Sequence, residues 1–474
     1  MSGFPFHSLR EFIAYLDSQG RLVRNSVEVD LRGEVAAISR KIGLTDGPAV
    51  LHESIKGYPG WQLFTDGLTT RERQAWALGV EPGEIGGRVS RFLADGHKMK
   101  PRIVDDGPCK EIKLLGHHVD LIRLPVAYTG EFDVPPFISA GISNAKDPET
   151  GWQNTAVRRF QLKGRQLLNH LLLPFQQEGM IFQKWRKLGK PMPLSIVVGT
   201  DPLYYLASQL PAPPQVDEQD YWGALTGEPL EVVRSETNDI LVPATAEIVI
   251  EGEVDLDERR LEGPYSEFTG YYSGVRYFPV IRVKAVTMRR DCIYQNIYNA
   301  QEPAEGGNIG YLMTEIELHR QVKAIIPELR EIRILSCWGL VLAVSIDKQA
   351  VRQKAGIVKK LFMAIKSAPA SQFVKTVIVV DDDIDLRNVQ HILWAMGTKF
   401  QGSKDITVID GAPGCILDPS EPWIQRGVGY TSITLLDCTE KLPPYDEPYR
   451  RGLSIPPLDA IRRVDERWRD YGFA

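Results

Sequence analysis

The chain has 474 residues, 43% of them hydrophobic and 25% charged, and this composition is typical of a globular protein with more than one domain. Its net charge of −5 argues against a nucleic-acid partner, because no excess of basic side chains is present to neutralise phosphates. The apolar runs are too short to cross a bilayer and the N-terminus lacks a signal-peptide pattern, so we expect a cytoplasmic protein without a membrane contact. The five cysteines form no CxxC or zinc spacing, and we expect them to be reduced.

Residues 1–115 show helix and strand signals that alternate, and these predict an α/β domain. Ser8 and Glu11 have the spacing of a capping box at the start of a helix, and Gly20 stops this helix. Asp30 is expected to cap a second helix with one apolar face.

Residues 116–312 have a different pattern. Short runs rich in β-branched residues, at 195–198, 247–250 and 280–286, are separated by Gly, Pro and Asp clusters. This pattern predicts the strands of a sheet or barrel.

Residues 313–442 return to alternation and predict a second α/β domain. The expected order is a helix at 314–325, a strand at 340–346, a helix at 351–366 and a strand at 375–380.

Residues 443–474 consist of a Pro-rich segment and a charged helix at 458–471. The apolar side chains of this helix form one narrow stripe, made of Ile461, Val464, Trp468 and Tyr471. Such a stripe buries little on its own chain, so we expect the helix to dock on a second copy and give a dimer or a multiple of dimers.

A possible catalytic constellation joins two distant segments. Glu262 and Glu267 lie five residues apart around a Gly-Pro turn, and Arg159 belongs to the segment QNTAVRRFQL about a hundred residues earlier. A carboxylate beside an arginine stays ionised and holds the guanidinium, while a second carboxyl group can hold and deliver a proton. The alternative is a structural ion-pair network.

Both segments resemble signature regions of the UbiD-type carboxy-lyases, which use prenylated FMN. The resemblance covers nearly the whole chain, and it includes LREFIAYLDSQGRL, GKPMPLSIVVGTDP, LEGPYSEFTGYY and VIVVDDDIDLRN. It implies an α/β (α+β) fold with a central split-barrel flavin-binding domain between two α/β domains, and a C-terminal dimerisation helix.

The resemblance also implies a set of site residues. The catalytic residues would be Arg159, Glu262 and Glu267, and the metal ligands would be Asn154, Gln177 and Glu218. The implied cofactor contacts are Asn154, Thr155, Ala156, Val157, Arg159, Gln176, Ser208, Leu210 and Glu218. The implied metal is divalent, Mn²⁺ before Mg²⁺ or Fe²⁺, with K⁺ as a further candidate ion.

Two positions depart from the family pattern. Gln177 stands where the family has a histidine ligand, and Ile433 aligns where it has a lysine near the flavin phosphate. A Gln carbonyl is a neutral oxygen donor that suits Mn²⁺ or Mg²⁺. Both changes would weaken the anchoring of the phosphate and the metal.

The resemblance implies a reversible, non-oxidative decarboxylase of an aromatic or α,β-unsaturated acid, with an aryl-CoA or aryl phosphate derivative as a further candidate substrate. Its expected partners are a flavin prenyltransferase that supplies the cofactor and further copies of the chain, up to a hexamer. The alternative is a cofactor-poor subunit that keeps the fold without its own chemistry.

Overall fold

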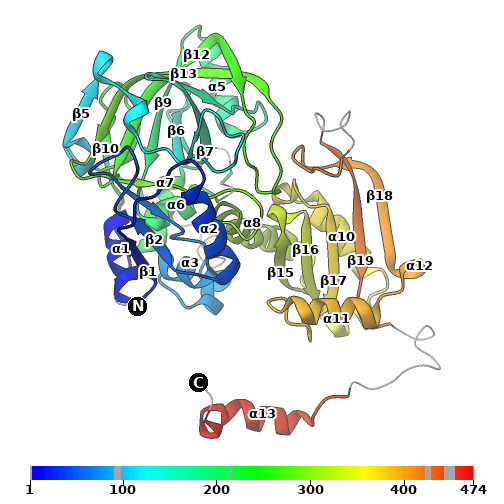
Figure 1. Cartoon of the computed structure of the whole chain (residues 1–474). Helices are drawn as coiled ribbons and strands as arrows, with labels where there is room; N and C mark the ends of the chain where they lie inside the picture. Colours follow the sequence, from blue (N-terminus) through cyan, green and yellow to red (C-terminus); the bar gives the residue numbers. More distant parts are fainter. Residues whose placement is uncertain are drawn as a thin grey trace.

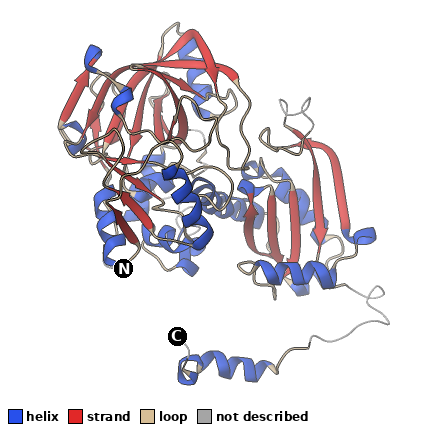
Figure 2. Cartoon of the chain, in the orientation of Figure 1, coloured by secondary structure: helices blue, strands red, loops and turns tan. Residues whose placement is uncertain are grey.

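The computed structural model describes residues 3–89, 98–210, 212–213, 215–421, 429–441 and 454–472. Figure 1 shows a β-barrel at the upper left, an N-terminal α/β region beneath it and a C-terminal sheet at the right. Figure 2 shows that strands dominate the barrel, whereas helices flank the other two sheets. The fold is therefore the mixed α/β arrangement expected from the sequence.

The N-terminal region is built on a four-stranded sheet of order β1-β2-β3-β14. Its strands are β1 (Leu22–Asn25), β2 (Ala49–His52), β3 (Gln62–Thr65) and β14 (Ile293–Gln295). Its helices are α1 (Leu9–Ser18), α2 (Glu34–Thr45) and α3 (Arg71–Ala77).

The starts of the first two helices test the predicted caps. Ser8 caps α1 as predicted, because its hydroxyl accepts a hydrogen bond from the Glu11 backbone N–H. The prediction for Asp30 is wrong: α2 begins at Glu34, after Gly33 with a φ of 101°. The Asp30 carboxylate instead accepts from the Arg32 N–H at 2.9 Å, which closes a turn before the helix.

The barrel is a closed ring of six antiparallel strands in the order β12-β9-β6-β7-β8-β13, and the pairing of β12 with β13 closes it. The runs rich in β-branched residues supply its strands, as predicted. The ring strands are β6 (Phe137–Lys146), β7 (Gln153–Gly164), β8 (Leu167–His170), β9 (Met192–Val198), β12 (Ile248–Glu262) and β13 (Arg276–Met288).

Other elements surround the barrel. The strand β5 (Ile112–Leu115) extends the ring at β13. A small sheet has the order β11-β10-β4 and consists of β4 (Arg102–Ile103), β10 (Glu231–Arg234) and β11 (Leu241–Pro243). The helices are α5 (Gln177–Lys187), α6 (Pro202–Ala207) and α7 (Glu218–Thr226).

The helix α8 (Glu305–Lys323) connects the barrel side of the molecule to the C-terminal sheet (Figure 1). It begins well before residue 314, where the sequence predicted its start. Its first turns contain three glycines, which disfavour a helix on local grounds. Packing overrides this preference, because a Cβ at Gly310 would collide with the Trp338 ring.

The C-terminal sheet has the order β15-β16-β17-β19-β18, with β16, β17 and β19 parallel. Its strands are β15 (Leu329–Ser336), β16 (Val341–Ile346), β17 (Thr376–Asp381), β18 (Ile406–Pro413) and β19 (Tyr430–Asp437). Its helices are α9 (Lys348–Gln353), α10 (Ile357–Ser367), α11 (Val389–Lys399) and α12 (Gly402–Asp405). The single helix predicted at 351–366 is divided into α9 and α10 before Gly356, which has a φ of 75°.

The last described helix, α13 (Leu458–Glu466), lies apart from the other elements in Figure 1. A short 3₁₀ turn at Trp468–Tyr471 follows it, so the predicted helix is interrupted. Val464, Trp468 and Tyr471 remain 38%, 44% and 48% exposed. The Pro-rich segment predicted before this helix lies mostly outside the described residues. Within the described part of the chain, no helix has the length and hydropathy of a membrane span.

Candidate active site

Arg159 on β7 lies at the centre of a buried ion-pair network. Its Nε and Nη2 atoms donate to the two carboxylate oxygens of Glu262, at 2.7 and 3.1 Å. Its Nη1 atom donates to Glu267. Glu262 and Glu267 are only 0% and 5% exposed, so the structure brings together all three residues predicted to be catalytic.

The loop after β12 positions Glu267. Glu262 ends the strand, and Gly263 then reverses the chain with a φ of 96°, a conformation that favours glycine. Ser266 donates its backbone N–H to Asp133 at 2.9 Å. The backbone N–H of Glu267 donates to the Tyr271 carbonyl at 3.0 Å. These hydrogen bonds hold the loop in the conformation in which the Glu267 carboxyl group faces Arg159.

The two kinds of charge in this network respond differently to burial. Burial lowers the pKa of Arg159, but the charges of Glu267 and Glu262 outweigh this effect and raise it overall. The Tyr265 ring adds a cation–π contact, since the guanidinium carbon lies 4.5 Å from its centroid. Burial raises the pKa of Glu267 despite the opposing charge of Arg159. Arg159 is therefore a permanent cation, and Glu267 is the group suited to hold a proton.

The three predicted metal ligands also meet. The Asn154 Nδ2 atom donates to Gln177 Oε1 and to Glu218 Oε1, both at 3.1 Å. Glu218 Oε2 accepts from the Thr155 N–H at 2.8 Å, and Gln177 Nε2 donates to the Ala212 carbonyl at 2.6 Å. Gln177 and Glu218 each begin a helix, α5 and α7, that brings it to β7.

The chemistry of this trio fits a hard divalent cation. The Asn154 Oδ1 atom is buried without a hydrogen-bond partner among the described residues. Burial raises the pKa of Glu218 to about 8, as expected for a carboxylate that lacks a neighbouring positive charge. The described residues contain no group of three or more His, Cys, Asp or Glu that could hold a metal. The side chains of Asn154, Gln177 and Glu218 each offer an oxygen atom, and oxygen is the donor that Mn²⁺ and Mg²⁺ accept.

His170 does not take the place of Gln177. It is fully buried at the end of β8, with its Nε2 atom 3.2 Å from Glu178 Oε2. Glu178 also lies 3.3 Å from Arg158 Nε. The histidine thus lies against Glu178, the partner of Arg158, rather than in the trio.

The other residues predicted to contact a cofactor lie on β7, at the start of α5, and at or just after the end of α6. Thr155, Ala156 and Val157 connect Asn154 to Arg159 along β7. Gln176 is the N-cap of α5. Ser208 caps the C-terminus of α6 and donates its hydroxyl to the Tyr205 carbonyl at 2.7 Å, and Leu210 is 6% exposed.

Ile433 requires a correction. It is 3% exposed and belongs to the apolar core of the C-terminal sheet, where it pairs with Ile409. A lysine there would bury an ammonium group among apolar side chains. The expectation that a phosphate-binding cation is missing at this position is therefore not supported.

Several residues of the site were not found from the sequence. Asp133 holds the backbone of the loop that contains Glu267, and Tyr265 covers the Arg159 guanidinium. Phe268 packs edge-on against Trp338, with ring centroids 5.5 Å apart, and so connects the loop to the C-terminal region. Their roles depend on contacts between distant segments, and no local spacing signals them.

Comparison with known proteins agrees with this architecture. The family model described as the 3-octaprenyl-4-hydroxybenzoate carboxy-lyase Rift-related domain matches residues 102–302. The corresponding N-terminal and C-terminal domain models match residues 13–93 and 307–438.

Solved structures extend the similarity over nearly the whole chain. The UbiD-class enzyme HmfF from Pelotomaculum thermopropionicum, in complex with FMN, is 31% identical, with 97% of this chain and 100% of that chain covered and a TM-score of 0.86. The vanillic acid decarboxylase of Sedimentibacter hydroxybenzoicus in open form is 28% identical, with 98% and 99% covered and a TM-score of 0.87. The 3,4-dihydroxybenzoic acid decarboxylase AroY of Klebsiella pneumoniae is 29% identical, with 97% and 99% covered and a TM-score of 0.87.

The chain belongs to the UbiD family, as its sequence motifs predicted, and it is an enzyme of the carboxy-lyase class. The closed barrel between two α/β regions is the fold of this family.

Proposed function

We propose that the protein is a prenylated-FMN-dependent, reversible, non-oxidative decarboxylase of an aromatic or α,β-unsaturated carboxylic acid. The observation that carries this proposal is the buried network of Arg159, Glu262 and Glu267. A similar chain, the evolved dimeric form of HmfF at 30% identity, is in complex with prenylated FMN. Two other similar enzymes are decarboxylases of vanillic acid and of 3,4-dihydroxybenzoic acid. Their similarity to this chain supports an aromatic acid as its substrate.

The roles of the three residues follow from their charges. Loss of CO₂ from an sp² carbon leaves an electron pair, and bound prenylated FMN would supply the electron sink. Arg159 would attract and orient the anionic substrate. Glu262 would hold the guanidinium in place, and Glu267 would deliver its proton to the carbon that loses CO₂.

Asn154, Gln177 and Glu218 would hold a divalent cation close to the flavin phosphate. Mn²⁺ is the first candidate, Mg²⁺ and Fe²⁺ are alternatives, and K⁺ is a further ion. A cation here would neutralise both Glu218 and part of the phosphate charge, whose burial would otherwise be costly. Thr155, Ala156, Val157, Gln176, Ser208 and Leu210 would line the cofactor site.

We further propose that the chain is organised as an N-terminal α/β domain at 1–115, a barrel domain at 116–312, a C-terminal α/β domain at 313–442, and a linker with the C-terminal helix at 443–474. The C-terminal helix would join two copies into a homodimer or a larger assembly such as a hexamer. A flavin prenyltransferase in the cytoplasm would supply the cofactor.

The alternative is a UbiD-like subunit with little cofactor and no chemistry of its own. The neutral Gln177 ligand favours this alternative, whereas the complete trio of Arg159, Glu262 and Glu267 favours an enzyme. The third possibility is an enzyme that acts on an aryl-CoA or aryl phosphate substrate.

One experiment separates these possibilities. The protein is produced together with a flavin prenyltransferase, and the released flavin is identified by absorption and mass. The same sample is then offered aromatic acids, unsaturated acids and their CoA or phosphate derivatives. We expect prenylated FMN and decarboxylation of at least one acid. Protein that carries no flavin and converts none of these compounds would support the cofactor-poor subunit.

A further inference from the structure

The loop that carries Glu267 has an aromatic anchor on each side of that residue in the sequence. Tyr265 packs edge-on against Phe137 of β6, with ring centroids 4.7 Å apart. Phe268 is 4% exposed, and its ring centroid lies 5.5 Å from that of Trp338, between β15 and β16. Both the barrel and the C-terminal region therefore determine where the backbone of Glu267 lies.

Phe268 is buried by side chains of the C-terminal region. Phe373, which precedes β17, lies 6.0 Å from Phe268 and 6.3 Å from Trp338, measured between ring centroids. Leu340 and Cys415 belong to the same buried cluster. The loop thus inserts one aromatic ring among residues that are distant from it in the sequence.

The turn that presents the Trp338 ring has a strained backbone. Cys337 and Trp338 have φ angles of 48° and 50°, and Gly339 follows with a φ of 100°. Positive φ angles are uncommon for residues with a side chain and unfavourable for a bulky one. Such a conformation persists only where the surrounding structure enforces it, and it is found most often near functional sites.

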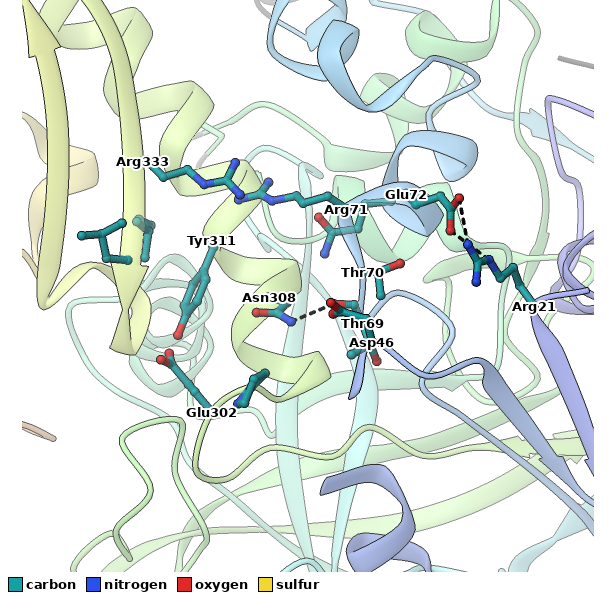
Figure 3. Close-up of a pocket in the computed structure, with 14 residues that line it drawn as sticks. Arg21, Asp46, Thr69, Thr70, Arg71, Glu72, Glu302, Asn308, Tyr311 and Arg333 are labelled. Atoms are coloured by element: carbon teal, nitrogen blue, oxygen red, sulfur yellow. Dashed lines mark hydrogen bonds and ion pairs between the residues drawn. The ribbon is translucent and has the colours of Figure 1, made fainter. Parts of the chain in front are cut away.

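Contacts from two segments enforce this turn. The Glu302 carboxylate accepts a hydrogen bond from the Cys337 N–H, and Figure 3 shows this carboxylate facing the Tyr311 hydroxyl of α8. The Trp338 Nε1 atom donates to the Thr314 hydroxyl of α8 at 3.2 Å. The turn and α8 therefore hold the indole ring in one orientation against the loop.

We propose that Trp338 is a positioning residue for Glu267. Through its contact with Phe268, it holds the loop in the conformation in which the Glu267 carboxyl group faces Arg159. The role assigned to Trp338 rests on the proposed function, in which Glu267 delivers the proton. It gives the C-terminal region a part in that proton transfer, although Trp338 acts only through the loop.

Loss of the Trp338 ring should leave the loop anchored on the barrel side alone. The groups that surround the Glu267 carboxyl group include Arg159, Glu262, Asp133, Tyr265 and Cys415. A substitution at Trp338 changes none of these groups chemically. A loop that opens more often exposes Glu267 to water, and this exposure moves its raised pKa down toward the ordinary value.

The first test needs no flavin. Hydrogen–deuterium exchange of the full-length protein is followed by mass spectrometry of its peptides. Trp338→Leu should speed exchange in residues 263–273 by about tenfold, the effect expected from loss of one buried aromatic pair. Exchange in β16 and β17 should rise less. Trp338→Phe should restore most of the protection, because a phenyl ring can still meet Phe268 edge-on.

The control is Trp394→Leu, which removes an indole ring from α11, where it packs against His391. This variant should leave exchange in residues 263–273 unchanged. If Trp338→Leu does not fold, Phe268→Leu removes the same contact from the loop side and is measured on the same peptide. Unchanged exchange in residues 263–273, or an equal rise in β16 and β17, would overturn the proposal.

The second test is the pH dependence of decarboxylation by flavin-loaded protein. Trp338→Leu should lower kcat by about tenfold or more, because misplacement of a reacting group is costly. The fall of kcat with rising pH should move to lower pH, and Trp338→Phe should reverse both effects. An unmoved pH profile in a variant with faster loop exchange would also overturn the proposal. Lack of decarboxylation by the unchanged protein would instead contradict the proposed function, and the exchange test would still decide whether Trp338 holds the loop.

Discussion

Arg159 and Glu262 form a two-point ion pair between strands that are not neighbours in the barrel. The Nε–Oε1 and Nη2–Oε2 distances are 2.7 and 3.1 Å, while β9 and β6 separate β12 from β7 in the ring. Both oxygens of Glu262 are used by this pair, and the residue is fully buried. Glu262 therefore holds the Arg159 guanidinium at two points, and Glu267, whose pKa is raised by burial, is the group suited to carry a proton.

The first prediction concerns Glu267. Glu267→Gln should lower kcat for decarboxylation by roughly 10²–10⁴-fold, the usual cost of losing a positioned acid. The fold should remain, because the amide has the same shape and can still accept a hydrogen bond from Arg159. Product release is measured by chromatography on protein with a confirmed flavin content. Glu258→Gln is the control, since Glu258 pairs with Arg282 away from the site. Activity near that of the unchanged enzyme would remove the central claim.

The second prediction concerns the pH dependence of the same group. Burial raises the pKa of Glu267 above its ordinary value, although Arg159 opposes the shift. If the protonated form delivers the proton, kcat should fall as pH rises through this pKa. The residual activity of Glu267→Gln should lack that decline, because the amide does not titrate. A decline of equal position and steepness in both proteins would assign it to another group.

Local signals in the sequence predicted much of the fold. Runs of β-branched residues indicated strands of the barrel, and the Ser8 cap indicated the first helix. The closure of the barrel by β12 and β13 could not be predicted from such signals, because this register depends on pairing over long distances. The early start of α8 was hidden by glycines that are required for packing against Trp338. Family motifs, rather than spacing, brought Arg159, Glu262 and Glu267 together.

Some residues of the site could not be predicted from the sequence, because their roles also depend on contacts between distant segments. Asp133 and Tyr265 act through the fold of a loop, and their residue types carry no chemical signature. Ile433, which the alignment of GVGYTSITLLDC placed opposite a lysine of the family, lies in the apolar core of the C-terminal sheet. The structure places the Gln177 side chain beside Asn154, and the role of Gln177 as a metal ligand stays a prediction.

The third prediction concerns the metal. Glu218 is the one carboxylate of the proposed ligand trio, so Glu218→Gln should abolish stoichiometric binding of Mn²⁺ by the purified protein. Gln177→His should retain binding and shift the preference toward metals that favour imidazole, such as Zn²⁺. Metal content is measured by mass spectrometry after titration and gel filtration. Glu231→Gln is the matched control, because Glu231 pairs with Arg102 in the small sheet. Unchanged Mn²⁺ binding by Glu218→Gln would place the metal elsewhere.

The fourth prediction concerns assembly. Val464 of α13 and Trp468 and Tyr471 of the turn after it are exposed on this chain, and Trp468 is 44% exposed. Such a stripe is expected to be covered by a second copy. Deletion of residues 458–474 should lower the mass measured by light scattering, while the far-ultraviolet circular dichroism per residue changes little. Equal masses per particle, corrected for the deleted residues, would show that α13 does not hold the assembly together.

The fifth prediction concerns stability and pH. Burial raises the pKa of Asp201 from 3.8 to about 6 in the folded protein. Between these values the folded state binds the proton more tightly than the unfolded state does, so this group lowers stability as pH rises from about 4 to about 6, and the loss persists above that. The pKa shift corresponds to a decrease in the free energy of unfolding on the order of 2–3 kcal/mol.

Asp201→Asn should remove this loss without breaking the local hydrogen bonds. The Oδ1 atom accepts from Trp222 Nε1 and from the Tyr204 N–H, both at 2.8 Å, and an amide oxygen can do the same. The amide nitrogen can donate to the Thr200 hydroxyl, which lies 3.3 Å from Oδ2. Relative to the unchanged protein, the variant should therefore gain stability between pH 4.5 and pH 7. Urea unfolding followed by tryptophan fluorescence measures this gain, with the exposed Asp257→Asn as the control. Stability profiles that run parallel for Asp201→Asn and the unchanged protein would show that Asp201 titrates alike in the folded and unfolded states.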